Sequence, residues 1–171
     1  MKISKPFHLQ NWISENQELL KPPVGNKNLY KDSGDYIVMV VGGPNQRKDY
    51  HYNQTEELFY QLEGNIKVHI QVDGEKQTIA LGPGEMFLLP AGIPHSPERS
   101  AGSVGLVIER KRAGKGFTDG LLWFCDGCNN KLHEVYFELK DIEKDFLPHF
   151  EHFKKTKELQ KCSKCGEYLS F

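Results

Sequence analysis

The sequence predicts a mostly β protein, a sandwich or barrel of short strands followed by a small metal-binding ribbon. Three observations lead to this fold class. Short β-prone runs separated by glycine fill residues 30–112, Asp73-Gly74 between two of them is a strong hairpin signal, and all four cysteines fall in the last 47 residues. Strands at this spacing favour a sandwich or barrel over alternating βα units.

The first 23 residues are expected to contain one short helix. Asn11 can cap it, and a Lys-Pro-Pro run at 21–23 ends it because neither proline can donate a backbone hydrogen bond. Its apolar face is expected to consist of Trp12, Ile13, Leu19 and Leu20.

Six β-prone runs are expected to be strands: 36–41, 58–62, 65–72, 76–81, 86–89 and 104–110. The glycine-rich segment 113–118 is expected to be a linker or loop. Beyond it we expect a strand at 135–139 and a helix starting near Pro148, with Phe150 and Phe153 on its apolar side and Phe146 just before it. The chain is therefore expected to divide into residues 1–115 and residues 116–171.

The composition excludes several classes of function. Lys and Arg number 22 against 23 Asp and Glu, and the resulting net charge of −1 gives no general attraction for nucleic acid or anionic membranes. No run approaches the roughly 18 apolar residues of a membrane span, and the N-terminus has no long apolar stretch. The sequence predicts a cytoplasmic protein without membrane or nucleic-acid partners.

Two segments carry histidine and glutamate in a frame of glycine and proline. In the first, His51 is followed six residues later by Glu57. The second has fixed positions at Gly84, Pro90, Gly92 and His95. This spacing resembles the cupin superfamily, whose two motifs place metal ligands on facing strands of a small β-barrel. The resemblance implies that His51, Glu57 and His95 bind a metal ion.

The first motif departs from the cupin pattern, which usually contains His-x-His. Here it reads His51-Tyr52-Asn53, so one histidine ligand is missing. Two histidines and one carboxylate occupy one face of an octahedral ion and leave three positions open, as in non-haem Fe(II) oxygenases. Three open positions can hold a bidentate substrate and O₂ together. The alternative, that both histidines are ordinary surface or core residues, stays open on the residues alone.

Three charged residues lie near these positions in the sequence. Arg47 precedes His51 by four residues, Arg99 follows His95 by four, and Glu109 falls late in the strand expected at 104–110. An inward-facing arginine is costly unless it meets an anion, and its planar fork suits a carboxylate. We expect this role for Arg99, whereas a solvated surface position stays open for Arg47.

The cysteines form two CxxC knuckles separated by 33 residues, Cys125/Cys128 and Cys162/Cys165. Each knuckle can supply two thiolates to one tetrahedral ion, either zinc or a single iron as in rubredoxin. A redox CxxC pair and disulfide bonds are the alternatives. We expect a single four-cysteine metal site.

A longer resemblance is carried by LKPPVGN at 20–26, VVGGPN at 40–45, EELFYQL at 56–62, FLLP at 87–90, HSP at 95–97, VIER at 107–110 and both cysteine pairs. The chain resembles the bacterial 3-hydroxyanthranilate 3,4-dioxygenases over nearly its full length. This implies a cupin double-stranded β-helix (jelly-roll) barrel with a short N-terminal helix and a C-terminal rubredoxin-like ribbon with a helix.

The resemblance also implies a function. In that family Fe(II) and O₂ open the ring of 3-hydroxyanthranilate to 2-amino-3-carboxymuconate semialdehyde, the precursor of quinolinate on the kynurenine route to NAD. The residues matching the substrate contacts are Arg47, Glu57, Arg99 and Glu109, with Arg47 and Glu57 also catalytic. It further implies a homodimer and an iron in the four-cysteine site that ring cleavage does not require.

Two other functions compete with this one. A metal-binding cupin could act as a sensor or binding module whose ribbon contacts nucleic acid, since five lysines lie near the second knuckle. Glu151, Glu158 and Glu167 interleave with those lysines, which favours a solvated helix face instead. The chain could also be another cupin dioxygenase or an isomerase.

Overall fold

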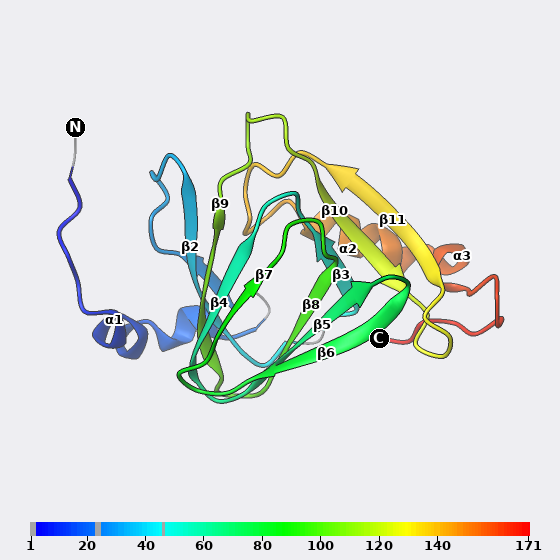
Figure 1. Cartoon of the computed structure of the whole chain (residues 1–171), viewed down its shortest axis with the longest axis horizontal. Helices are drawn as coiled ribbons and strands as arrows, with labels where there is room; N and C mark the ends of the chain where they lie inside the picture. Colours follow the sequence, from blue (N-terminus) through cyan, green and yellow to red (C-terminus); the bar gives the residue numbers. More distant parts are fainter. Residues whose placement is uncertain (1–2, 23–24, 46) are drawn as a thin grey trace.

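The described residues of the computed structural model, 3–22, 25–45 and 47–171, form two antiparallel sheets that face each other (Figure 1). One sheet has the order β1 (Asn26–Asn28), β2 (Tyr36–Gly42), β9 (Val104–Arg110), β4 (Glu57–Glu63) and β7 (Met86–Leu89). The other has the order β11 (Lys131–Phe137), β10 (Asp119–Phe124), β3 (Asp49–Tyr52), β8 (His95–Arg99), β5 (Ile66–Val72) and β6 (Glu75–Leu81). The predicted fold class is confirmed.

The main core lies between the sheets because side chains alternate in direction along each strand. On β4, buried residues alternate with half-buried ones, so that Phe59 faces the core and Tyr60 faces away from it. The buried cluster comprises Ile37, Met39, Phe59, Ile66, Val68, Ile70, Leu81, Leu89 and Val107. Both sheets contribute to it, so their inner faces together enclose the apolar core.

The predicted hairpin joins β5 to β6. Asp73 has a φ of +52° and Gly74 a φ of +81°, the positive values that a two-residue type I′ turn requires. Val72 pairs with Glu75 across this turn, and the register continues to Ile66 opposite Leu81. The turn thus sets which residues of β5 face the interior.

The N-terminal helix, α1 (Leu9–Glu15), begins before the predicted cap. His8 occupies the cap position in an extended conformation, and its Nδ1 accepts a hydrogen bond from the backbone N–H of Asn11 at 3.4 Å. The prediction that Asn11 caps the helix is therefore wrong. An imidazole nitrogen here satisfies a first-turn N–H, as an amide oxygen commonly does.

The predicted apolar face of this segment is confirmed only in part. Ile13 and Leu20 are buried and Trp12 packs beside them, but Leu19 is 45% exposed. A separate 3₁₀ turn, η1 (Gln17–Leu20), replaces the second half of the expected helix, so the helical spacing does not continue through it. Pro23, the end of the predicted stop, lies outside the described residues.

Three strands of the second sheet lie outside the predicted runs. β3, β8 and β10 carry Asp49, Pro97, Glu98 and Asp119, residue types that are depleted in strands. These segments form strands because neighbouring strands pair with them, not because their residues favour strands. For example, β10 pairs with β3 over four residue pairs. The six predicted strands are all present, with ends shifted by at most one residue.

The C-terminal segment continues this second sheet. β10 pairs with β3 and β11 pairs with β10, so the strand expected at 135–139 lies earlier, at Lys131–Phe137. The predicted helix is α2 (Leu147–Lys155), followed by α3 (Lys157–Gln160). Phe153 of α2 is buried and stacks on Trp123 of β10 with ring centroids 4.3 Å apart, which holds α2 against the sheet (Figure 1).

The division of the chain at residue 115 stays a prediction. The segment beyond it has its own apolar cluster, formed by Leu121, Trp123, Leu139, Phe146, Phe153 and Leu169. It also shares the second sheet with the strands before it. In the part of the chain that the structure describes, no helix has the length and apolar character needed to cross a bilayer.

Candidate active site and second metal centre

The structure brings His51, Glu57 and His95 together in the interior. His51 on β3 and His95 on β8 are direct cross-strand partners in one sheet, and Glu57 begins β4 in the facing sheet. One potential ligand atom from each lies within 4.8 Å of the others, and all three side chains are buried. Residues 44 positions apart in sequence thus become neighbours through strand pairing.

Hydrogen bonds hold two of these side chains in place. His95 presents Nε2 to Glu57 Oε2 at 3.1 Å, while its Nδ1 lies 3.1 Å from the backbone carbonyl of Ile93. Asn53 occupies the position where the cupin pattern has its second histidine, and it donates from Nδ2 to Glu57 Oε2 at 3.1 Å. This residue therefore supports the carboxylate with a hydrogen bond.

The electrostatics of the cluster favour an ionised carboxylate. Burial opposes the charge on Glu57, but the neighbouring His95 imidazole outweighs it and lowers the pKa of Glu57 to about 2. Burial lowers the pKa of His51, whereas the Glu57 carboxylate outweighs burial at His95 and raises the pKa of that imidazole. Neutral imidazole and ionised carboxylate are the forms that bind metal, so this buried N₂O donor set fits a divalent transition-metal ion.

Arg99 lies on the same strand as His95, four residues further on, and therefore on the same face. Its side chain is buried, and among the described residues its Nη1 has no hydrogen-bond partner. Asn45 fixes its backbone, accepting from Arg99 N at 2.7 Å. Burial lowers the pKa of Arg99 to about 10, so it stays a cation at neutral pH. A buried guanidinium with a free donor suits a bound anion.

Glu109 is also buried and lies opposite Glu57 in the β4–β9 register. Its Oε2 accepts a hydrogen bond from Arg112 Nη1 at 2.7 Å. Burial and the nearby Glu57 carboxylate raise the pKa of Glu109 to about 7, although Arg112 opposes the shift.

Arg47 precedes β3 and is held by contacts on two sides. It forms a bidentate ion pair with Asp49, with Nε 3.1 Å from Oδ1. Its guanidinium carbon lies 5.7 Å and 5.4 Å from the ring centroids of Phe146 and Phe150. The side chain is 30% exposed, so Arg47 is a partly buried and ordered residue rather than a freely solvated charge.

A cavity of about 670 Å³ is lined by Arg47, Phe146 and Phe150 among others, but by none of the His/Glu/His cluster. The Phe146 ring lies 4.9 Å from the His51 ring between centroids. One aromatic side chain of the C-terminal segment thus contacts both this cavity and the metal-binding cluster.

Arg112 and Asp119 also lie beside the cluster, although neither is among the residues predicted from the sequence. Asp119 Oδ1 lies 2.8 Å from His51 Nε2, and Arg112 bonds both oxygens of Asp119. Both residues flank the glycine-rich segment that was expected to be a linker. No local signal marks them, because their contacts arise only when β10 pairs with β3.

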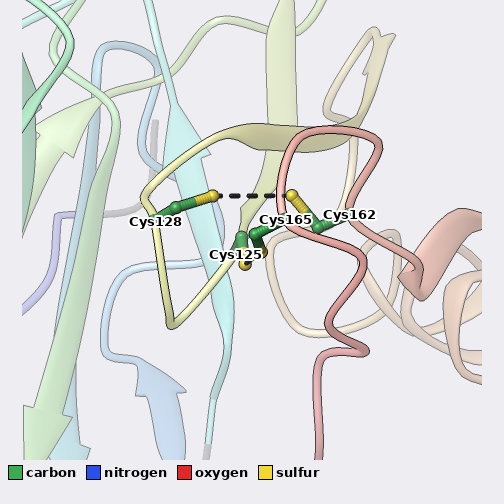
Figure 2. Close-up of side chains that lie close together, drawn as sticks. All are labelled: Cys125, Cys128, Cys162 and Cys165. Atoms are coloured by element: carbon green, nitrogen blue, oxygen red, sulfur yellow. Dashed lines mark hydrogen bonds between the residues drawn. The ribbon is translucent and has the colours of Figure 1, made fainter.

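The second centre gathers all four cysteines. Figure 2 shows their side chains converging from the loop between β10 and β11 and from the loop after α3. The Sγ atoms lie within 4.8 Å of one another, with Cys125–Cys165 and Cys128–Cys162 each 3.5 Å apart. Four sulfurs bound at about 2.3 Å to a tetrahedral ion would be about 3.8 Å apart, so the set fits such an ion.

The two knuckles share one backbone design. The carbonyl of Cys125 accepts from Asn129 N, and that of Cys162 accepts from Gly166 N, each at 2.9 Å. Asn129 and Gly166, each following the second cysteine, have positive φ values of +55° and +81°. Backbone N–H groups of the second knuckle, chiefly that of Cys165, lower the pKa of Cys162 to about 6, which favours the thiolate that binds metal.

Two facing antiparallel sheets around a buried His/Glu/His cluster are the arrangement expected of a metal-dependent enzyme built on a β-sandwich. A family model described as 3-hydroxyanthranilic acid dioxygenase matches residues 1–154. The chain belongs to this family.

Two relatives show the extent of the similarity. The 3-hydroxyanthranilate 3,4-dioxygenase of Xanthomonas oryzae pv. oryzae (strain MAFF 311018) is 52% identical over 161 residues, which cover 94% of this chain and 90% of the relative. The enzyme of the same name from Burkholderia cenocepacia is 47% identical over 167 residues, covering 97% and 93%. Among solved structures, a cupin-2 domain containing protein from Shewanella frigidimarina matches with a TM-score of 0.47 and 22% identity, covering 57% of this chain and 91% of that one.

Proposed function

We propose that this protein is a 3-hydroxyanthranilate 3,4-dioxygenase. It would cleave the substrate ring with O₂ to give 2-amino-3-carboxymuconate semialdehyde, which closes without enzyme to quinolinate on the kynurenine route to NAD. The observation that carries the proposal is a buried arginine with an unpaired donor, Arg99, on the same strand face as the ligand cluster. The family membership supports it.

In this proposal His51, Glu57 and His95 hold Fe(II), and their donor set leaves one face of an octahedral ion open. Fe(II), when bound, would supply Lewis acidity and the capacity to activate O₂. The burial of the cluster keeps bulk water from the reacting groups.

Arg99 binds the substrate carboxylate. Its free Nη1 provides the donor, and a charged hydrogen bond of this kind contributes about 1.5–3 kcal/mol. Because Arg99 lies on the same strand face as His95, its guanidinium holds the ring in one orientation relative to the cluster. This contact between Arg99 and the substrate carboxylate, called the carboxylate clamp below, selects substrates that carry a carboxylate beside the amino group.

Glu109 and Arg47 act on the other groups of the substrate. Glu109 uses one oxygen to bind Arg112, which leaves the second oxygen to accept a hydrogen bond or a proton from the amine side. Arg47, steadied by Asp49 and two phenyl rings, supplies positive charge where negative charge develops on oxygen during ring opening.

The four-cysteine centre is proposed to hold a second iron, with zinc as the alternative. Its role in this proposal is structural, because the two knuckles tie the C-terminal residues to the β10–β11 loop. None of its sulfurs belongs to the His/Glu/His cluster.

The partner of this chain is proposed to be a second copy of itself. The outer face of the first sheet carries apolar side chains that alternate with the core residues: Tyr36, Val38, Leu58, Tyr60, Leu88 and Ile108. Leu88 is 53% exposed and Tyr36 is 55% exposed. An apolar sheet face of this extent is typical of an interface between subunits. No nucleic acid or membrane is part of this proposal, and the protein is proposed to be cytoplasmic.

Oxygen uptake tests the proposed activity. The Fe(II)-loaded protein is incubated aerobically with 3-hydroxyanthranilate, and the long-wavelength absorbance of the product is followed together with O₂. We expect one O₂ consumed per substrate. Uptake with 2-aminophenol, which lacks the carboxylate, should be far slower. If 3-hydroxyanthranilate causes no uptake, the protein is instead a binding module or another cupin enzyme.

A further inference from the structure

A buried ion network connects the ligand cluster to the proposed substrate site. Asp119 is fully buried and Arg112 is 2% exposed. Arg112 donates to Asp119 from Nε at 2.9 Å and from Nη2 at 2.6 Å. From Nη1 it also donates to Glu109 at 2.7 Å and to Thr55 Oγ1 at 3.3 Å. One guanidinium therefore bridges two buried carboxylates.

The first carboxylate of this network contacts a proposed metal ligand. Asp119 Oδ1 lies 2.8 Å from His51 Nε2. Both oxygens of Asp119 already accept hydrogen bonds from Arg112 Nε, at 3.1 Å and 2.9 Å. A carboxylate held by a guanidinium in this way accepts from the histidine as well, so His51 carries its proton on Nε2 and keeps the lone pair of Nδ1 free.

The network costs desolvation energy that a structural role alone does not explain. Two buried carboxylates and one buried guanidinium are often no more stabilising than apolar residues of the same size. Carboxylates that accept from a metal-binding histidine, in contrast, fix its tautomer and ring orientation. The network lies between His51 and Glu109, where it can orient the His51 ring and hold the Glu109 carboxylate.

We infer that Asp119 and Arg112 are positioning residues for the active site. Asp119 orients the His51 ring for metal binding, and Arg112 holds Asp119 and Glu109 in one fixed relation, so that the ligand cluster and the substrate-binding carboxylate keep the same alignment. This inference rests on the proposed function for the roles of His51 and Glu109. It assigns both residues a part in catalysis without contact with the substrate.

Mn(II) affinity tests the inference independently of the substrate. Mn(II) prefers nitrogen and oxygen donors to thiolates, so its titration into the full-length protein, followed by the EPR signal of free Mn(II), reports on the His/Glu/His cluster. Asp119→Asn should weaken Mn(II) binding roughly 10- to 100-fold, the usual effect of removing a partner of a metal-bound histidine. Asp35→Asn, which removes an exposed carboxylate paired with Lys115, is the matched control and should bind as the wild type does.

A second pair of variants tests the bridge. Arg112→Lys keeps the positive charge but cannot reach both carboxylates with a planar fork, so it should lower kcat for 3-hydroxyanthranilate and raise KM through Glu109. Arg110→Lys alters an exposed arginine two residues away and should change neither. Thermal unfolding of every variant separates loss of alignment from loss of the fold. A folded Asp119→Asn protein with wild-type Mn(II) affinity would overturn the inference.

A measurement on the wild type decides the matter if the variants do not fold. Nitrogen-15 NMR of the histidine-labelled, Zn(II)-bound full chain should show His51 protonated on Nε2, with that proton protected from exchange. A His51 proton on Nδ1 would contradict the inference. The wild-type protein could bind Mn(II) and carry the His51 proton on Nε2, yet show no ring cleavage. That result would overturn the proposed function and leave the role of Asp119 intact.

Discussion

The two metal centres differ in how they depend on the rest of the chain. The His/Glu/His cluster takes its residues from strands of both sheets, and a buried network of hydrogen bonds supports it. The four cysteines lie on two loops with Cys165 exposed, and backbone turns within each knuckle shape the site. Strand pairing positions the ligands of the first centre. In the second centre, the four cysteines connect two loops and so help to order the C-terminal segment.

This difference explains how each centre can be changed. A site made by strand pairing is already shaped before an ion binds, so removing one ligand should affect binding and chemistry but leave the barrel intact. A site made by two short loops gains much of its order from the ion itself. Loss of that ion should therefore loosen the segment while the distant interior keeps its geometry.

The largest effect is expected from His51→Ala. This variant should lose both iron retention and ring cleavage, because only two of the three protein ligands remain to hold the ion. Elemental analysis and oxygen uptake measure the two losses. His69→Ala removes a histidine that bonds Thr78 and Glu98 away from the cluster, and it should keep both properties. Full activity of an iron-loaded His51→Ala protein would rule out His51 as a ligand.

Arg99→Ala should have the next largest effect, on substrate binding. Loss of a charged hydrogen bond of about 1.5–3 kcal/mol corresponds to a fall in kcat/KM of about 10- to 100-fold for 3-hydroxyanthranilate. The variant should no longer distinguish this substrate from 2-aminophenol. Arg110→Ala, at an exposed position, is the control. Unchanged kcat and KM in Arg99→Ala would remove this residue from the carboxylate clamp.

Cys125→Ser should have the smallest effect on ring cleavage. Proteolysis should become faster between residues 125 and 171, because one ligand of the second centre is lost, while turnover stays measurable. Ser163→Ala, in the other knuckle but outside the ligand set, should resist proteolysis as the wild type does. Complete loss of turnover in a folded Cys125→Ser protein would indicate an electron-transfer or catalytic role for the second centre.

Much of this architecture could be predicted from local patterns. The Asp73-Gly74 turn and the β-branched runs have their effect within a few residues, and the motif spacing singled out His51, Glu57 and His95 as a group. The structure does bring these three together.

The remainder depends on contacts between distant segments. β8 contains Pro97 and two charged residues, so its sequence does not resemble a strand until β5 and β3 pair with it. Arg112 and Asp119 looked like the flanks of a linker, yet they form the most buried ion network beside the cluster. His8 and not Asn11 caps α1, because the helix begins at Leu9 and Asn11 already lies in its first turn.

Ring cleavage is proposed to depend on the His/Glu/His centre alone. The most direct test is turnover of 3-hydroxyanthranilate by protein that carries zinc in the four-cysteine centre and increasing amounts of Fe(II) in the other. We expect activity proportional to the Fe(II) bound by the His/Glu/His centre, reaching its full value with zinc still in place. Activity that appears only when the cysteines hold iron would contradict it.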